Sequence, residues 1–552
     1  MKKFYDKIGQ SEKVAFFATF FFGYIIHLYA FTNLIPNSDG ISRLYDPQQM
    51  TISGRWFLHY ATMFNAYIEA PALIGAFSIL FMACTAAMLV RLFVIQTTKG
   101  AALTGLILIA FPSSAYTYAY IFTASAYFFG ILLSVLSAGC IFRAVFDISK
   151  DSSKSNNRIL KKRIIAGVLG VLLLACATGI YQAYFSFATT VLFLTMLFRI
   201  PDSWGSRQKV RVYLRSFGLL LAGAVAYAVI LKIFLMWKQL TLLSYRNMDE
   251  VAGSSFLYRI FKMIPSVYKD FFFYYFKTGT EPYIDRWTVV FNLLLLTATI
   301  ISLYSTRKKF RLARALFVLF ILPLCVNCTA LLSNNAPIMR YSFVLQYLAV
   351  VAVLEYGLSK KTTSEDIKAD VVGIEAGTES RKGIFKGVQY IVIIVLVLLN
   401  IRFVQTDNFV YMALQTAQRS SESFLTRLVE RVESTPGYTK DMEVLLIGIY
   451  PQDAYYSGIP EFSRVQHYSS PSNTVLRETK HLYYYLNKWM NVPWKEPTEK
   501  ELIATSDSEV LKAMPLYPSD GSIIIRDNQV IVRLSESYIP KEDYEIQYEK
   551  RR

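Results

Sequence analysis

The sequence predicts an α-helical membrane protein with about eleven transmembrane helices, and three observations lead to this fold class. Hydrophobic residues make up 54% of the 552 residues and charged residues only 18%, too few to cover a soluble protein of this size. The apolar residues gather in runs of about 20, the length that crosses a bilayer as a helix. Basic residues cluster between these runs, as in cytoplasmic loops. The net charge of +18 therefore indicates a membrane and not nucleic acid.

The charge pattern places each helix in turn. The first run, 14–34, follows several lysines and is too long for a signal-peptide core, so we interpret it as a signal anchor. The uncharged stretches 101–142 and 164–198 have basic residues at both ends, which predicts a helical hairpin in each, turning near Pro112 and near 179–182. The remaining helices are expected at 69–90, 216–236, 287–305, 315–332, 342–358 and 388–404.

Two polar regions are expected outside the membrane. The loop 237–286 contains an aromatic, lysine-bearing stretch, Phe256–Phe276, that suits a helix lying in the membrane interface. Counting from an inside N-terminus puts the tail outside as well, so we expect a transmembrane domain over 1–404 and a small extracytoplasmic α/β domain over 405–552. The tail should contain helices at 409–433 and 478–490, a strand at 443–449, and a hairpin of 522–525 with 530–534 around Asp527-Asn528.

Motifs of soluble enzymes are missing from the sequence. It has no P-loop, no GxGxxG, no HExxH and no paired histidines, so neither a cofactor nor a metal site is expected. All five cysteines lie in hydrophobic runs, and no disulfide framework is expected in the tail. A site on the outer face would lack access to cytoplasmic nucleotides. The donor of a transfer reaction there should therefore be carried by a lipid.

The first outer loop contains the most informative residues. Asp39 lies just beyond the end of the first helix, and Arg43, Asp46, Arg55 and Trp56 follow within the same short stretch. Charges at the mouth of a helical bundle are costly unless they are paired or used. A binding site is one interpretation, and an interfacial salt-bridge cluster with a tryptophan anchor is the other.

Several short motifs resemble those of one family. They are Asn37-Ser-Asp-Gly40, Ser53-Gly-Arg-Trp56 and Gly179-Ile-Tyr-Gln182, with Ile447-Gly448 and the stretch 515–534 in the tail. In this order and topology the chain is similar to the type II O-antigen glucosyltransferases over nearly its whole length. The resemblance implies a GT-C-like fold in the bacterial cytoplasmic (inner) membrane. It also implies transfer of glucose from polyprenyl-phosphate glucose to a surface polysaccharide acceptor outside, with inversion, alongside a polyprenyl-phosphate glucose synthase and a small flippase.

Cations at the outer boundaries suit the phosphate of such a donor. Arginine binds phosphate oxygens with its planar fork, so Arg55 and Arg340 are predicted to hold the donor phosphate, with Arg43 and Lys277 nearby. No motif specifies which hexose is transferred.

Carboxylate and aromatic residues supply the other expected roles. Asp39 is predicted to be the catalytic base, and Asp46 is the alternative, although Pro47 after it favours a turn. The alternative, structural interpretation of Asp39 is a salt bridge to Arg43. Trp56, Tyr181 and Gln182 are candidates for binding the sugar, and helix packing is the other account of Tyr181 and Gln182.

Two further function classes remain open at this point. A flippase or transporter of lipid-linked saccharides would share the many helices, but corresponding broken helices in two halves would be expected of it, and no such halves are recognisable. A polysaccharide polymerase or ligase would also carry a large outer loop, but it would transfer a whole glycan.

Overall fold

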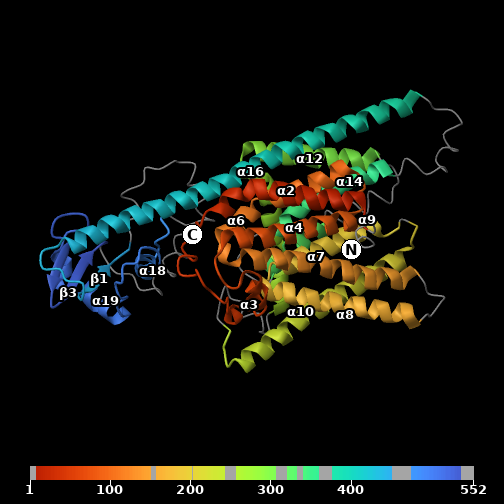
Figure 1. The fold of residues 1–552 in the computed structure, drawn as a ribbon. Coiled ribbons are helices and arrows are strands. Elements are labelled where there is room, and N and C mark those ends of the chain that lie inside the picture. The colour runs from red at the N-terminus through yellow and green to blue at the C-terminus, as the bar shows by residue number, and fades with distance from the viewer. Residues whose placement is uncertain are drawn as a thin grey trace. The chain divides into compact units, whose positions relative to one another are not determined.

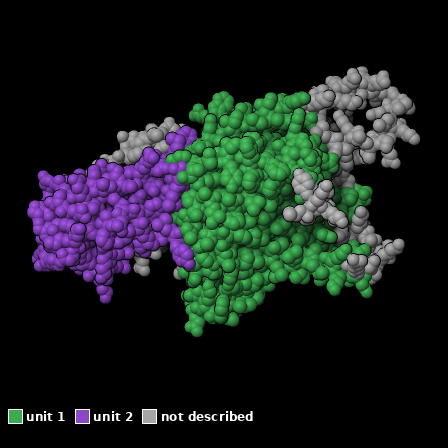
Figure 2. All heavy atoms as spheres, viewed as in Figure 1, with its two compact units in different colours: residues 1–32, 46–118, 123–408 green, residues 33–45, 119–122, 409–552 purple. Residues whose placement is uncertain are grey.

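The computed structural model describes residues 8–150, 157–201, 203–242, 256–281, 283–305, 317, 320–331, 340–359, 376–449 and 474–535. The chain divides into two compact units (Figure 2). Unit 1 comprises residues 1–32, 46–118 and 123–408, and unit 2 comprises 33–45, 119–122 and 409–552. The sequence also predicts a basic cytoplasmic segment at 307–314, an outer turn through Asn334 and Pro337 and a charged loop at about 359–386. The first two and residues 360–375 of the loop lie outside the described residues, whereas the rest of the loop, from Ala376, is helical.

Unit 1 is helical (Figure 1). Within it α2 packs against α4 and α5, and α8 packs against α10. Its elements are α2 (Gln10–Thr32), η1 (Thr51–Ser53), α3 (Leu58–Ala61), η2 (Thr62–Asn65), α4 (Pro71–Phe93), α5 (Thr98–Ala110), α6 (Ser113–Ala119), α7 (Ile121–Lys150), α8 (Asn157–Ile180), α9 (Tyr184–Arg199), α10 (Ser206–Trp237), α11 (Phe256–Phe276), α12 (Arg286–Ser305), a helix at 320–326, η4 (Cys328–Leu331), η5 (Tyr341–Val344), α14 (Leu345–Ser359) and the first part of α16 (Ala376–Glu433).

Seven helical segments of the described chain are long and apolar enough to cross a membrane. They lie in α2, α4, α5 with α6, α7, α8, α10 and α16, and three shorter apolar helices lie at 184–199, 286–302 and 341–355. Outward faces of these helices are apolar. On α10, Leu214, Phe217, Leu221 and Val225 are each more than half exposed at helical spacing, as lipid contact requires. The protein is thus a polytopic membrane protein, and the number of eleven crossings stays a prediction.

The charge-free stretch after Lys99 differs from the expected hairpin. Pro112 separates α5 from the short helix α6, and the two candidate spans meet at Tyr120 instead of near Pro112. Proline disfavours the helical conformation in the residue before it, and Phe111 is accordingly extended. The second hairpin turns where expected, because α8 ends at Ile180 and α9 begins at Tyr184.

The helix α16 is the longest element. It joins the two helices expected at 388–404 and 409–433 into one helix of 58 residues, about 87 Å long at 1.5 Å per residue. The connecting residues 405–408 are polar, but neither glycine nor proline occurs between 388 and 433 to stop the helix. Residues up to 408 belong to unit 1 and those from 409 belong to unit 2.

Unit 2 contains a three-stranded sheet in the order β1-β3-β2. Strand β1 (Glu443–Ile447) is parallel to β3 (Gln529–Arg533), and β2 (Ile523–Arg526) is antiparallel to β3. The predicted hairpin is confirmed, with Asp527 and Asn528 both at positive φ in the tight turn. The accompanying helices are α18 (Thr479–Trp489), α19 (Glu499–Ser506) and α20 (Glu509–Ala513).

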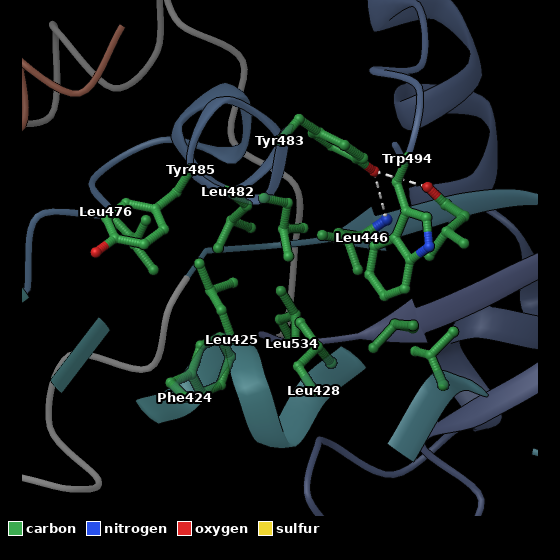
Figure 3. Packing of buried hydrophobic residues seen from close by; sticks show 14 of the residues in the cluster. Phe424, Leu425, Leu428, Leu446, Leu476, Leu482, Tyr483, Tyr485, Trp494 and Leu534 are labelled. Carbon is green, nitrogen blue, oxygen red and sulfur yellow. Dashed lines mark hydrogen bonds between the residues drawn. The ribbon is translucent and has the colours of Figure 1, made fainter. Parts of the chain in front are cut away.

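Both faces of this sheet are buried. Strand residues alternate between the faces, so Val444 and Leu446 join one core cluster while Leu445 and Ile447 join another. In the larger cluster, side chains of α16 face those of β1 and α18 (Figure 3). The Tyr483 hydroxyl accepts from the Leu446 amide and donates to the Val444 carbonyl, both at 2.9 Å, so its polar end is satisfied inside the core.

Candidate functional site

Two of the sequence motifs dock against each other in unit 1. The Gln182 Nε2 atom donates to the Ser53 carbonyl at 2.9 Å, and the Tyr227 hydroxyl of α10 donates to the Gly54 carbonyl at 3.0 Å. Gly54 has φ of +80°, and a Cβ atom there would lie 2.6 Å from Gln182 Nε2. Only glycine therefore fits this turn, and the motif Ser53-Gly-Arg-Trp56 is tied to the turn between α8 and α9.

The Trp56 side chain fills the same junction. Its indole lies against Gly179, where a Cβ atom would come within 2.6 Å of the ring, and it stacks on Phe234 with ring centroids 5.5 Å apart. The Phe57 amide donates to the Gly179 carbonyl at 2.9 Å. Trp56 is only 6% exposed. Packing between the two motifs accounts for the ring, but the buried Nε1 atom has no hydrogen-bond partner among the described residues. The predicted contact of Trp56 with sugar stays untested.

Arg55 projects from this junction onto an aromatic pair. Its guanidinium carbon lies 5.2 Å from the centroid of the Tyr181 ring, and Tyr181 stacks on Tyr127 at 5.3 Å. Cation–π contacts of this kind hold a half-buried guanidinium in place. The structure thus brings Arg55, Trp56, Tyr181 and Gln182 together from two separate motifs.

A second polar group surrounds Arg340, which precedes η5. Its Nη1 atom lies 3.1 Å from Asp270 Oδ1 of α11, and its Nε atom lies 3.5 Å from Glu281 Oε1 in the loop after α11. Asn327 Nδ2 also donates to Asp270 Oδ2, at 2.8 Å. The aromatic rings of Tyr274 and Phe343 lie under the guanidinium at 5.6 and 5.7 Å. Arg340 therefore has two carboxylate partners within the protein, an environment that the sequence reasoning did not anticipate.

Glu281 is the most buried of the three charged residues in this group. Its residue is 7% exposed, and its Oε2 atom has no hydrogen-bond partner among the described residues. Burial raises the pKa of Glu281 to about 7, against the lowering effect of Arg340 and with a further raise from Asp270. A proton on this carboxyl is consequently gained and lost near neutral pH.

The helix α11 positions Asp270 through an amphipathic pattern. Its buried residues Val267, Phe271, Tyr274 and Tyr275 recur at helical spacing, while Lys269 and other polar residues are exposed. Its observed bounds agree with the aromatic segment predicted as an interfacial helix, and it is not among the candidate spans of the described chain. Lys277 follows α11, is exposed, and lies 4.8 Å above the Phe273 ring.

Asp285, in the same loop as Glu281, serves a structural role. Its Oδ1 atom accepts from the Thr288 amide at 2.9 Å and caps the first turn of α12, and its other oxygen pairs with Arg402 of α16. This bond fixes α16 to the start of α12 within unit 1.

The segment containing Asp39 belongs to unit 2. The Trp489 Nε1 atom donates to the Ile41 carbonyl at 3.0 Å, Lys488 Nζ donates to the Ser42 carbonyl at 3.1 Å, and Ile41 lies in the core of unit 2. Asp39 itself is exposed. Arg43 Nε donates to the backbone carbonyl of Asp39 at 3.2 Å within a series of turns, and not along one helical face.

Phe122 and His481 are neighbours of this segment. The Arg43 guanidinium also lies 5.1 Å from the Phe122 ring. Burial lowers the pKa of His481 to about 4, although Glu478 and Asp39 act in the opposite direction. The neutral His481 ring accepts from the Arg477 amide at 3.2 Å, which suits a structural histidine beside the Asp39 segment.

Asp46 forms the turn that Pro47 had indicated. Its Oδ1 atom accepts from the Gln48 amide at 2.8 Å, and Gln48 adopts a positive φ of 54°. Asp46 belongs to unit 1, so the two acidic candidates of the first loop lie in different units.

One comparison with known proteins decides the family. The family model for the glucosyl transferase GtrII matches residues 28–354, more than half of the chain. The chain belongs to the GtrII glucosyltransferase family. No curated protein and no solved structure matches the chain. The resemblance seen in the sequence is thereby confirmed for this family, while the tail motifs 447–448 and 515–534 fall outside the matched range.

The GtrII match includes every predicted site residue and also the acidic partners of Arg340. Sequence reasoning missed Asp270, Glu281 and Asn327. Asp270 is the one acidic residue of the aromatic stretch Phe256–Phe276, and this isolated charge could have marked it as a candidate site residue. The composition of that stretch had indicated a membrane-anchoring role, which obscured it.

Proposed function

We propose that this GtrII-family protein moves a single hexose, most simply glucose, from a polyprenyl-phosphate donor to a surface glycan outside the membrane, with inversion. The observation that carries this proposal is the docking of two family motifs around Arg55. Its guanidinium is half-buried in a setting of tyrosines within a membrane protein. A lipid-linked phosphodiester would supply an anionic partner for this guanidinium.

In this proposal Arg55 holds the donor phosphate. The planar guanidinium binds two phosphate oxygens at once and stabilises the charge that grows on the leaving phosphate. Arg340 is the weaker candidate, because Asp270 and Glu281 already balance its charge and would repel an anion. Exposed Lys277 and the boundary residue Arg43 would attract the donor at longer range.

Asp39 is proposed as the base. The acceptor hydroxyl attacks the anomeric carbon, its proton passes to the Asp39 carboxylate, and the bond from carbon to phosphate oxygen breaks to release polyprenyl phosphate. One displacement inverts the anomeric carbon. The exposed side chain of Asp39 supports this role, whereas the Asp46 carboxylate is already engaged in its turn.

The membrane side can be tested by labelling. We propose that the protein lies in the bacterial cytoplasmic membrane with its C-terminal residues outside, where donor arrives through a synthase and a small flippase. Lys500 of α19 is exposed in unit 2. In a variant without native cysteines, Lys500→Cys should react with an impermeant maleimide in intact spheroplasts. Reaction only after lysis would overturn this orientation.

The transfer itself is tested with purified protein in lipid nanodiscs. Polyprenyl-phosphate glucose and a surface-glycan acceptor should give a product extended by one hexose, with the anomeric configuration inverted by NMR. UDP-glucose should give none. Movement of a lipid-linked saccharide across vesicles without transfer would identify a flippase instead. Transfer of a whole glycan would identify a polymerase or ligase.

A further inference from the structure

Glu281 has an acceptor atom that the protein leaves unfilled. Its Oε1 atom lies 3.5 Å from Arg340 Nε, whereas the buried Oε2 atom has no hydrogen-bond partner among the described residues. A buried carboxylate oxygen without a hydrogen-bond donor destabilises the folded protein, so buried polar groups are nearly always paired. The ion pair with Arg340 explains one half of this carboxylate and not the other.

A second carboxylate in unit 1 is in the same state. Asp407 of α16 is 0% exposed, and neither of its oxygens has a hydrogen-bond partner among the described residues. Tyr116 of α6 has both Glu281 and Asp407 among its electrostatic neighbours. Three carboxylate oxygens, Oε2 of Glu281 and both oxygens of Asp407, thus lack a hydrogen-bond donor among the described residues, and both carboxylates act electrostatically on the buried Tyr116.

The missing partner should bring hydrogen-bond donors and no negative charge. The carboxylates of Asp270 and Glu281 already outnumber the single guanidinium of Arg340, so this cluster would repel a phosphate. Hydroxyl groups donate to carboxylate oxygens, and the rings of Tyr274 and Phe343 beside the cluster suit the apolar face of a sugar. We propose that Glu281, positioned by Arg340, accepts hydrogen bonds from hydroxyl groups of a saccharide substrate and thereby selects the sugar.

The cluster is open to solvent at one end. Side-chain exposure falls from 30% at Asp270 through 17% at Arg340 to 6% at Glu281. The loop residues Lys277 to Gly279, just before Glu281, are exposed. A purely structural ion pair needs no such gradient, but a subsite must be reached from outside.

Rigid supports hold this cluster in place. The Tyr275 hydroxyl donates to the Phe343 carbonyl at 2.6 Å, and Asn292 Nδ2 of α12 donates to the Tyr275 carbonyl at 2.9 Å. The Tyr347 hydroxyl of α14 then donates to Asn292 Oδ1 at 3.0 Å. The helices α11, α12 and α14 are therefore joined by buried hydrogen bonds next to Glu281, as a selective subsite requires.

The inference rests on the proposed transfer of a hexose, and deoxy sugars test it separately. In the first arm, short-chain polyprenyl-phosphate glucose and its 2-, 3-, 4- and 6-deoxy analogues are compared as donors. In the second arm, the parent acceptor is compared with acceptors that lack single hydroxyl groups. One deoxy position should cost the wild-type protein about 10- to 100-fold in kcat/KM, the range for a hydrogen bond to a charged group. The arm in which this occurs tells whether donor or acceptor hydroxyls are bound.

Glu281→Gln should lose a similar factor with the parent sugar and no further factor with that deoxy analogue. Arg340→Lys should give the same loss of discrimination, because a lysine cannot orient the carboxylate in the same way. Asp285→Asn is the matched control. It breaks an ion pair on the same loop, so it should lower thermal stability and keep the wild-type deoxy profile.

A wild-type deoxy profile in both Glu281→Gln and Arg340→Lys would overturn the inference. If either variant fails to fold, Glu281→Asp replaces it and should shift the preferred deoxy position. If the wild-type protein transfers no sugar at all, the proposed function fails. Equilibrium binding of the same analogues to wild-type and Glu281→Gln protein then decides the subsite by itself, and equal binding by the two would refute it.

Discussion

Asp39 and Glu281 are both acidic residues on loops that follow helices, yet the protein surrounds them differently. Asp39 is exposed on a segment tied to unit 2 by hydrogen bonds to its backbone. Glu281 is 7% exposed in unit 1 and is paired with Arg340. The contrast separates two uses of a carboxylate. An exposed carboxylate can stay ionised without a desolvation penalty and so remain available as a base, whereas a buried one with an unfilled oxygen is suited to recognise a ligand.

The largest effect is expected at Asp39. Asp39→Asn should lower the transfer rate by about 10²- to 10⁴-fold, because the amide cannot accept the proton of the attacking hydroxyl. Donor binding and protein level should stay at the wild-type values. Asp46→Asn is the matched control, since an asparagine oxygen can still accept from the Gln48 amide. A rate for purified Asp39→Asn within a few-fold of wild type would exclude Asp39 as the base.

The pH dependence of thermal stability tests the buried state of Glu281, the second residue of the comparison. Burial raises the pKa of folded Glu281 from 4.5 to about 7. The contribution of Glu281 to the free energy of unfolding is therefore fully present below pH 4.5, the pKa of the unfolded state. This contribution is lost as the pH rises through about 7, the pKa of the folded state. Between these two limits the free energy of unfolding changes by on the order of 3 kcal/mol, since a pKa difference of one corresponds to about 1.36 kcal/mol.

Glu281→Gln cannot titrate and provides the measurement. Its thermal unfolding midpoint should lie furthest below that of the wild-type protein at pH 5, and the gap should shrink by pH 8. A gap that is constant across this range would show that Glu281 does not titrate there, and with it the contrast to Asp39 would weaken.

The sequence predicted the elements of the fold where one chemical pattern dominates. Long uncharged runs located the helices, and two short apolar segments around a polar turn located the hairpin of β2 and β3. It did not predict that Pro112 divides off α6, or that α16 continues without a break. These outcomes depend on local backbone geometry at a few residues, which a hydropathy pattern averages over.

For the candidate site, the sequence indicated candidate residues but not their partners, and the roles of these residues stay predictions. The motifs pointed to Arg55 and Gln182, and the structure brings them together. Arg340 was recognised as a boundary cation, but Asp270 lies 70 residues away in sequence. No periodicity links two such positions. Only the fold shows that the charge of Arg340 is compensated inside the protein.

Arg55 and Arg340 should respond differently to a donor without its sugar. Polyprenyl phosphate offers the anion alone, so Arg55→Lys should weaken its binding by about tenfold through loss of the bidentate contact. Arg340→Lys should leave this affinity unchanged, because Arg340 faces two carboxylates. Binding of polyprenyl phosphate to the two variants in nanodiscs measures both. Equal weakening by both substitutions would return Arg340 to the phosphate site.

The smallest effect is expected at the anchor of the Asp39 segment. Trp489→Phe removes the indole N–H that donates to the Ile41 carbonyl but keeps an aromatic ring stacked near Tyr485. One neutral hydrogen bond contributes about 0.5–1.5 kcal/mol, so a looser Asp39 segment should lower kcat about two- to tenfold with donor affinity unchanged. The control is Trp494→Phe. Its Nε1 atom lies 3.4 Å from the Tyr438 hydroxyl in the same core, and the Asp39 segment takes no part in that bond. If both substitutions lower kcat equally, general loosening of unit 2 is responsible, and the position of Asp39 does not depend on this one bond.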